Sequence, residues 1–247
     1  MKVVWLRLRV APLRLIRVKT VNCGMRFLLP IVILLLLLSC ETQEVTPTRP
    51  DYYPLKIGFW QSYRVTGVDW YNNQATPFDY ELKTEITDSF VSGSGEDRFV
   101  ISRYTRPTGF FTWTYLDTWS AWADDHGLQL AEGNVIYKKI RLPVAVGGVW
   151  NSNEFNSKEP DEYLLKSEGE SFARFGDCIR VLEEDDYTFF ANDDYRESFY
   201  ASGVGLVYKY VKHRKYCTDA DLPCYNTGYI EEGHEEEIQI VGFSQLE

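Results

Sequence analysis

The side chains best suited to acid–base or metal chemistry are carboxylates that occur in close pairs. They are Asp185-Asp186, Asp193-Asp194 and Asp219-Ala-Asp221. A calcium loop also needs a central glycine and a distal glutamate, which these segments lack. Two carboxylates about 5 to 10 Å apart would suit glycoside hydrolysis, so an envelope carbohydrate-active hydrolase stays open as an alternative function.

The histidines and glycines form no known catalytic pattern. His126, His213 and His234 have neither helical nor zinc-ligand spacing, and His234 lies in an acidic run that we expect to be a solvated turn. The chain contains no Gly-x-Ser-x-Gly elbow and no phosphate-binding glycine loop in a strand–helix context. We therefore predict no catalytic residue, no metal site and no cofactor.

Aromatic residues are concentrated between Phe110 and Trp122. If this segment is a strand, alternation places on one face Phe111, Trp113, Tyr115 and Trp119. With Trp122, this row is the candidate ligand-binding surface, because flat rings can stack on sugars or line an apolar cavity. The threonines on the opposite face would suit solvent, so the same row is also expected of a buried core.

The first 39 residues have the composition of a signal peptide. Seven basic residues and no acidic residue precede Cys40, and the stretch from Phe27 to Ser39 carries no charge. That stretch is shorter than the roughly 20 apolar residues that span a bilayer and fits the apolar region of a signal peptide. Met25 is an alternative start, because a leader beginning there would have an ordinary length.

The end of this leader resembles the bacterial lipobox, in the residues Leu37-Leu38-Ser39-Cys40. The resemblance implies that Cys40 is the lipid-attachment site and carries palmitate-type chains that hold the protein on a membrane of the cell envelope. The outer membrane is the expected membrane, with either its periplasmic or its surface face. Residues 40–53 are largely polar and are predicted to be a tether.

The charge of the remaining chain excludes one class of partner. Without the seven basic residues of the leader, 19 basic residues face 36 acidic ones, a formal charge of about −17. Such a surface repels phosphate backbones, so nucleic acid is not an expected partner.

The rest of the chain, residues 54–247, is predicted to be a single all-β domain, mainly antiparallel. Aromatic and β-branched residues are abundant and turn signals recur at short intervals. One hairpin is expected between Tyr80–Phe90, with Tyr80, Leu82, Thr84, Ile86 and Phe90 on one face, and Arg98–Tyr104. Further strands are predicted at 110–118, 135–142, 162–166, 178–182, 187–191, 197–201, 206–213 and 236–243. So many short strands indicate a sandwich or a partly open barrel.

A weak internal repeat favours two β-meanders within that domain. Pro54-Leu-Lys-Ile-Gly-Phe-Trp60 recurs as Pro143-Val-Ala-Val-Gly-Gly-Val-Trp150, with chance similarity as the competing explanation. Proline suits a strand entrance, glycine permits a kink, and tryptophan can anchor a core.

The order of lipobox, polar tether, the Pro54–Trp60 segment and Tyr200-Ala-Ser-Gly-Val-Gly-Leu-Val-Tyr208 resembles uncharacterised β-rich lipoproteins of Bacteroidetes-type bacteria. The resemblance implies an envelope location and a β-rich domain but no activity.

The cysteines that follow Cys40 fit an oxidising compartment. Cys217 and Cys224 flank a short loop and are predicted to form a disulfide. Cys178 is expected to be a buried free thiol, although pairing with either of the other two is an alternative.

These observations predict a lipid-anchored, non-enzymatic binding or structural module of the cell envelope. The expected partners are the membrane, through the anchor, and an unidentified envelope protein, glycan or apolar ligand.

Overall fold

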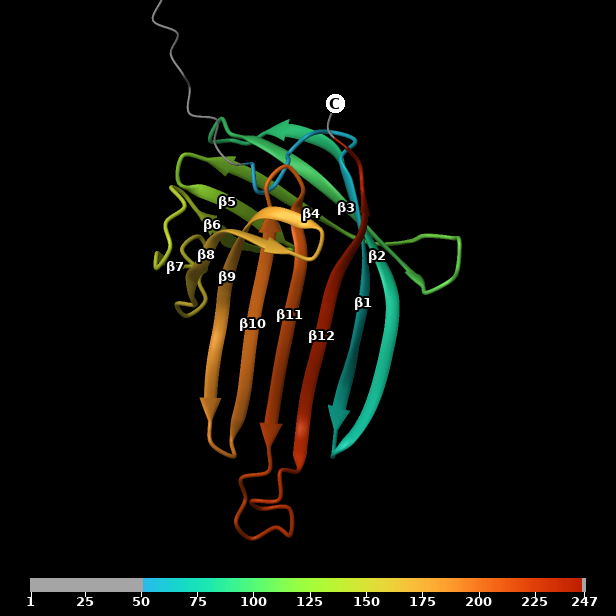
Figure 1. The fold of residues 1–247 in the computed structure, drawn as a ribbon, viewed down its shortest axis with the longest axis vertical. Coiled ribbons are helices and arrows are strands. Elements are labelled where there is room, and N and C mark those ends of the chain that lie inside the picture. Colours follow the sequence, from blue (N-terminus) through green and yellow to red (C-terminus); the bar gives the residue numbers. More distant parts are fainter. Residues whose placement is uncertain (1–50, 246–247) are drawn as a thin grey trace, which may run out of the picture. The chain divides into compact units, whose positions relative to one another are not determined.

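The computed structural model describes residues 51–245, which form one antiparallel sheet of twelve strands (Figure 1). The strands are β1 (Trp60–Tyr71), β2 (Gln74–Val91), β3 (Asp97–Pro107), β4 (Thr114–Asp124), β5 (Gly127–Glu132), β6 (Val135–Arg141), β7 (Val149–Asn151), β8 (Glu162–Phe172), β9 (Phe175–Thr188), β10 (Asn192–Ala201), β11 (Gly205–Tyr216) and β12 (Ile230–Phe243). Within this part of the chain, no helix is long and apolar enough to cross a membrane.

The strand order shows two six-stranded meanders joined side by side. It runs β6-β5-β4-β3-β2-β1-β12-β11-β10-β9-β8-β7, so β1 pairs with β12 between the two halves. The two strands at the ends of this order, β6 and β7, lie next to each other. The Lys138 amide donates to the Ser152 carbonyl at 2.8 Å, and Trp150 Nε1 donates to the Lys138 carbonyl at 2.9 Å. The sheet is therefore a nearly closed barrel. The predicted all-β fold of two meanders is confirmed, and of the two predicted architectures, sandwich and partly open barrel, the structure shows the barrel.

The two repeated segments occupy equivalent places, at the start of each meander. Gly58 and Gly147 both have a positive φ, of 86° and 82°, a conformation that glycine adopts without steric cost. The Gly58 amide donates to the Ile86 carbonyl at 2.7 Å, and the Gly147 amide donates to the Leu165 carbonyl at 2.9 Å. The residue after each glycine donates back three residues along the chain, to Lys56 and to Ala145. The repeat is thus a structural one.

The predicted hairpin between residues 80–90 and 98–104 is present as β2 and β3, with one correction. Leu82 and Ile86 are buried on the inner face, as alternation predicts, but Phe90 is 48% exposed. The pairing shifts between Ile86 and Asp88, where a β-bulge adds one residue and turns the following side chains to the opposite face.

A second correction concerns the strand predicted at 187–191. This segment is the tip of the hairpin between β9 and β10, where the Ala191 amide donates to the Thr188 carbonyl at 2.8 Å. Phe190 has a φ of 58°, which is unusual for a bulky side chain. The prediction of a strand here was wrong, because the aromatic residues that favour a strand lie at a turn.

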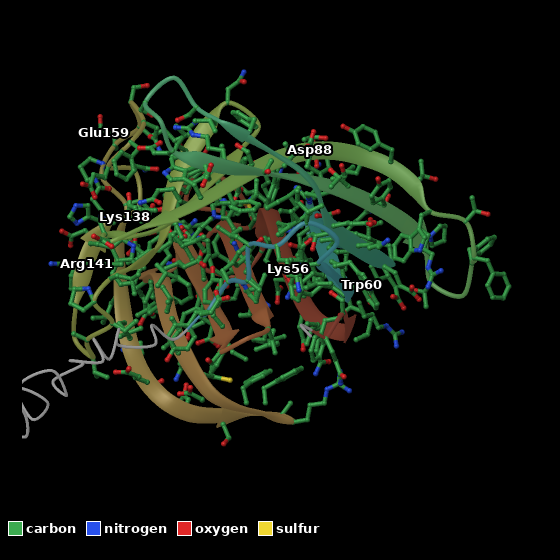
Figure 2. All side chains as sticks on the ribbon, turned by 90° about the horizontal axis from the view of Figure 1, so that it is seen from above. Lys56, Trp60, Asp88, Lys138, Arg141 and Glu159 are labelled. Atoms are coloured by element: carbon green, nitrogen blue, oxygen red, sulfur yellow. A yellow bond between two sulfur atoms is a disulfide. The ribbon has the colours of Figure 1, made fainter. Side chains whose placement is uncertain are left out.

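Residues 52–59 form a cap segment that crosses one end of the barrel; Lys56, labelled in Figure 2, lies along it. Tyr52 is 3% exposed and Phe59 6%, and Tyr53 packs against two of the core clusters. The tether was predicted to reach residue 53, and Tyr52, near its predicted end, is buried in the folded part. The predicted signal peptide, and the tether up to residue 50, lie outside the described residues.

The opposite end of the sheet is open. Residues 74–79 of β2 pair only with β1, and residues 183–188 of β9 pair only with β10. The long strands β9 to β12, β1 and β2 therefore continue beyond the closed part as a curved sheet with two free edges (Figure 1). We call this part the extension.

Candidate functional site

The closed part of the sheet contains a cavity of about 260 Å³. Its wall combines tyrosines, aliphatic side chains and charged groups from both meanders and the cap segment. The lining residues are Tyr53, Tyr63, Tyr80, Leu82, Thr84, Ile101, Arg103, Trp119, Leu128, Leu130, Glu132, Lys139, Tyr200, Leu206, Lys209, Val211, Glu236 and Ile238. A concave apolar surface with a few polar groups is typical of a small-molecule site, although this volume is slightly below the usual 300–1,000 Å³ or so.

Arg103 is the cation placed most directly in this wall. Its guanidinium lies 3.6 Å from the centre of the Trp119 ring, and its Nη1 is 3.4 Å from Asp117 Oδ2. Burial lowers the pKa of Arg103, against the opposing effect of the carboxylates of Asp117 and Glu132. Arg103 Nε and Asp117 Oδ1 are buried without a hydrogen-bond partner among the described residues. A ligand with a hydrogen-bonding group could satisfy the arginine.

The other charged groups of the wall are already engaged. Lys139 Nζ lies 2.7 Å from Glu132 Oε1, and the Tyr80 hydroxyl donates to Glu236 Oε2 at 3.3 Å. Burial, followed by the nearby Glu236 carboxylate, raises the pKa of Tyr80 to about 12. Burial likewise raises the pKa of Tyr53 to about 12. Both phenols are therefore neutral at physiological pH and present hydroxyl groups that can donate or accept.

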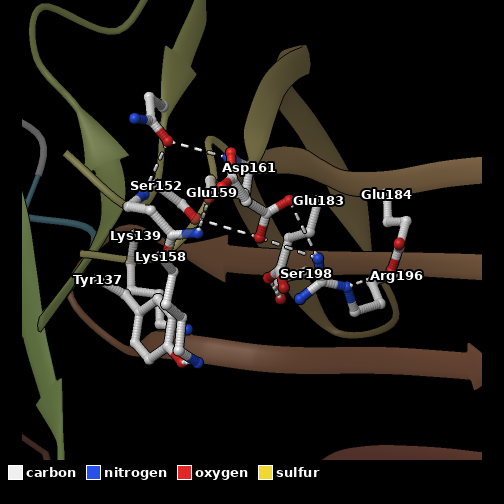
Figure 3. A network of polar contacts seen from close by, with 12 residues as sticks. Tyr137, Lys139, Ser152, Lys158, Glu159, Asp161, Glu183, Glu184, Arg196 and Ser198 are labelled. Atoms are coloured by element: carbon white, nitrogen blue, oxygen red, sulfur yellow. Dashed lines mark hydrogen bonds and ion pairs between the residues drawn. The ribbon is translucent and has the colours of Figure 1, made fainter. Parts of the chain in front are cut away.

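Behind the cavity wall lies a polar network centred on Glu183 (Figure 3). The carboxylate of Glu183 is fully buried, accepts a hydrogen bond from Ser198 Oγ and lies 3.4 Å from Lys209 Nζ. Burial is the largest single effect and raises the pKa of Glu183, but Lys209, Lys139, the hydrogen bond from Ser198 and Arg196 together outweigh it and lower the pKa to about 2. Glu183 is therefore ionised at neutral pH and pairs with Lys209, which also lines the cavity.

The same network ties β9 and β10 to the segment before β8. Arg196 donates from Nε to Glu184 Oε2 at 2.7 Å and from Nη2 to Asp161 Oδ2 at 3.0 Å. Asp161 also accepts from Ser152 Oγ at 3.2 Å, next to the junction of β6 and β7. These contacts hold the barrel closed beside the cavity.

The predicted aromatic row is not present as a single face. Strand β4 begins at Thr114 rather than at residue 110, so Phe111 lies in the preceding loop and is 93% exposed. The pairing with β3 shifts between Arg103 and Tyr104, which places Tyr115 and Trp119 on opposite faces, and Tyr115 is 59% exposed. Of the five candidates, only Trp119 lines the cavity.

The three tryptophans of the row are each covered by an arginine from β3. Besides Arg103 over Trp119, the guanidinium of Arg106 lies 4.2 Å from the Trp113 ring centre, and that of Arg98 lies 4.0 Å from the Trp122 ring centre. Each such contact contributes about 0.5 to 2 kcal/mol. One face of each indole is occupied in this way. Trp119 and Trp122 therefore link β4 to β3, and Trp113 links the loop before β4 to β3.

The cysteines are placed as predicted where they are described. Cys217 and Cys224 form a disulfide at the tip of the β11–β12 connection, which confirms that prediction. Cys178 is a buried free thiol, and burial raises its pKa, so it is an unreactive core residue. Cys40, the predicted lipid-attachment site, lies outside the described residues.

One further expectation from the sequence is changed by the structure, and two cavity residues were not predicted. His234 is not in a turn but in β12, directly opposite His213 of β11. The cavity residues Arg103 and Lys209 were not identified from the sequence. The available signal was a charged residue at an inward position, as in Ile101-Ser-Arg103, where alternation places Arg103 on the same face as the buried Ile101.

Comparisons with known proteins leave the function open. The sequence matches no family model and no curated protein. Among solved structures, it is similar to a protein of Bacteroides fragilis NCTC 9343 described as exported with a YmcC-like fold, with 9% identity and a TM-score of 0.44, over 78% of this chain and 98% of the other. A protein of Parabacteroides distasonis ATCC 8503 described as a lipoprotein gives 11% identity and a TM-score of 0.40 over the same shares. Neither similarity assigns a ligand or an activity to this chain.

Proposed function

We propose that this chain is a lipid-anchored protein of the cell envelope that binds a small amphipathic ligand in the barrel cavity. The observation that carries the proposal is the cavity wall itself, where Arg103 presents a buried, unpartnered Nε beside Trp119 and a largely aliphatic surface. A ligand with an apolar body and a hydrogen-bond acceptor would match both parts of this wall.

The cavity favours a small molecule over the other partners expected from the sequence. The cap segment closes one end of the barrel, and a volume of about 260 Å³ is too small for a glycan chain or for a segment of another protein. The carboxylates of the wall, Glu132 and Glu236, are engaged by Lys139 and Tyr80. We therefore propose binding rather than hydrolysis.

The anchoring part of the proposal depends on the leader and on Cys40. Two or three acyl chains, each contributing about 0.8 kcal/mol per buried methylene, would hold the protein on a membrane without any contact between lipid and barrel. The outer membrane is the proposed location. Metabolic labelling with a palmitate analogue should mark the wild-type chain and not the variant Cys40→Ser; equal labelling of both would refute the anchor.

The ligand is tested by native mass spectrometry of the full chain extracted from its own membrane in mild detergent. We expect an adduct of constant mass on the wild-type protein and its loss in Val211→Trp, in which a large ring enters the cavity. Val241→Trp is the matched control, because Val241 is 51% exposed and is not part of the cavity wall. An adduct that persists in Val211→Trp, or none on the wild-type protein, would contradict cavity binding.

A further inference from the structure

The inner face of the extension carries a row of ionisable residues that the cavity does not use. In the register of the sheet, Asp194 of β10 lies opposite His213 of β11, His213 lies opposite His234 of β12, and His234 lies opposite Asp69 of β1. Directly opposed side chains on antiparallel strands have Cβ atoms about 4.5 to 5.5 Å apart. The two imidazoles are therefore neighbours, with one carboxylate on each side.

Each carboxylate is hydrogen-bonded to the nearer imidazole through the same ring nitrogen. His234 Nδ1 donates to Asp69 Oδ1 at 2.7 Å, and His213 Nδ1 bonds Asp194 Oδ1. A neutral histidine that donates from Nδ1 keeps the lone pair on Nε2, which is the form that binds metals. The bond to a carboxylate also fixes the ring orientation and makes the other nitrogen a stronger ligand.

The bonds to the carboxylates leave the Nε2 side of each ring turned away from its carboxylate. Asp194 and Asp69 lie on the outer sides of the histidine pair, so both Nδ1 atoms point outward along the row. In an imidazole ring, the Nε2 lone pair points well away from the Nδ1–H bond. Each Nε2 atom would therefore face away from its carboxylate, on the side of the row where the other histidine lies.

Phe78 packs against the ring of His234, and both histidines stay accessible to solvent. Phe78 of β2 stacks on His234, with ring centres 5.7 Å apart and planes inclined by 15°. Phe78 itself lies over Gly67, where a Cβ atom would come within 2.3 Å of its ring, so this position requires glycine. The side chains of His213 and His234 are 54% and 43% exposed, so an ion in solution can reach them.

We propose that His213 and His234 form a two-nitrogen binding site for a divalent transition metal, with Zn²⁺ as the representative ion. Imidazole suits zinc, copper and nickel ions, and carboxylate partners on the far ring nitrogens are the usual support of such ligands. In the part of the chain that is described, no group of three or more His, Cys, Asp or Glu residues is arranged to hold a metal. The site therefore supplies two ligands and leaves the remaining positions to water or to a donor from a bound molecule.

The test is isothermal titration calorimetry of the full-length protein in detergent with Zn²⁺. We expect one zinc per chain, and a loss of affinity of about tenfold or more in His213→Asn and in His234→Asn, since removing even a supporting carboxylate costs about 10- to 100-fold. His126→Asn is the matched control and should bind zinc as the wild-type protein does, because His126 lies in the loop between β4 and β5.

A second measurement counts the ligands. Electron paramagnetic resonance with Cu²⁺ should show coupling to two imidazole nitrogens in the wild-type protein and to one in either asparagine variant. The proposal is overturned if the wild-type protein takes up no zinc, or if the double variant His213→Asn/His234→Asn keeps wild-type affinity. Arg103→Met, which alters the cavity wall, should leave zinc affinity unchanged, so that the metal site and the ligand cavity are tested separately.

Discussion

The buried ion pair behind the cavity wall gives the sharpest stability prediction. The pKa of Glu183 falls from an ordinary 4.5 to about 2, because Lys209, Lys139, the hydrogen bond from Ser198 and Arg196 together outweigh the effect of burial. Each unit of pKa difference corresponds to 1.36 kcal/mol, so ionised Glu183 stabilises the folded state by about 3 kcal/mol at neutral pH. Glu183→Gln removes the charge at nearly constant volume and should lower the free energy of unfolding by about that amount.

The pH dependence has a definite sign. Because the folded pKa lies below the unfolded one, the contribution of Glu183 is complete above about pH 4.5 and is lost as the pH falls toward 2. Urea unfolding followed by circular dichroism at neutral pH and across this window measures both effects. In Glu183→Gln, the part of the pH dependence that belongs to this residue should disappear.

Two further variants test whether the loss of stability comes from the ion pair. Glu159→Gln changes an exposed glutamate and should leave the free energy of unfolding within about 0.5 kcal/mol of the wild-type value. Adding Lys209→Met to Glu183→Gln should restore part of the loss, because the lysine no longer faces a neutral partner. A Glu183→Gln protein as stable as the Glu159→Gln control would show that the ion pair does not hold this side of the barrel.

Three other predictions concern the stability of the barrel. Gly58→Ala should lower the free energy of unfolding by about 1 to 2 kcal/mol, because Gly58 has a positive φ. Gly93→Ala should leave it nearly unchanged, because Gly93 has no positive φ and a Cβ atom would also meet no neighbour there; thermal unfolding compares the two variants. Replacing Cys217 and Cys224 together by serine should lower the unfolding free energy by about 2 to 3 kcal/mol, and a smaller loss in urea titration would mean that the loop is constrained in other ways. Trp150→Phe removes the donor to a β6 carbonyl and should cost about 1 to 3 kcal/mol, with faster amide exchange at the β6–β7 junction; unchanged exchange would argue against that junction as the closure of the barrel.

Much of the fold could be predicted from local patterns. Alternation located the β2–β3 hairpin, and the repeated proline–glycine–tryptophan segments marked the starts of the two meanders. The equivalence of these segments lies in the glycines, since Trp60 and Trp150 are offset by one residue relative to Gly58 and Gly147. Such a repeat predicts two similar halves but not how they join.

The candidate site was harder to predict from the sequence than the fold, partly because of the β-bulges. The shift opposite Arg103 reverses the faces of β4, so the aromatic row read from strict alternation does not exist. His213 and His234 are 21 positions apart in the chain and become neighbours only through the register of β11 and β12. The same is true of the cavity, whose wall combines strands from both meanders. Cross-strand partners of this kind cannot be read from residue spacing in one sequence.

A crystal structure of the full chain, purified in mild detergent from the membrane in which it resides, tests cavity binding most directly. We expect continuous density inside the barrel, in contact with the Arg103 guanidinium and the Trp119 ring and too extended to be water. A barrel whose inner side chains close the cavity, with Arg103 turned away to bond other protein atoms, would contradict it.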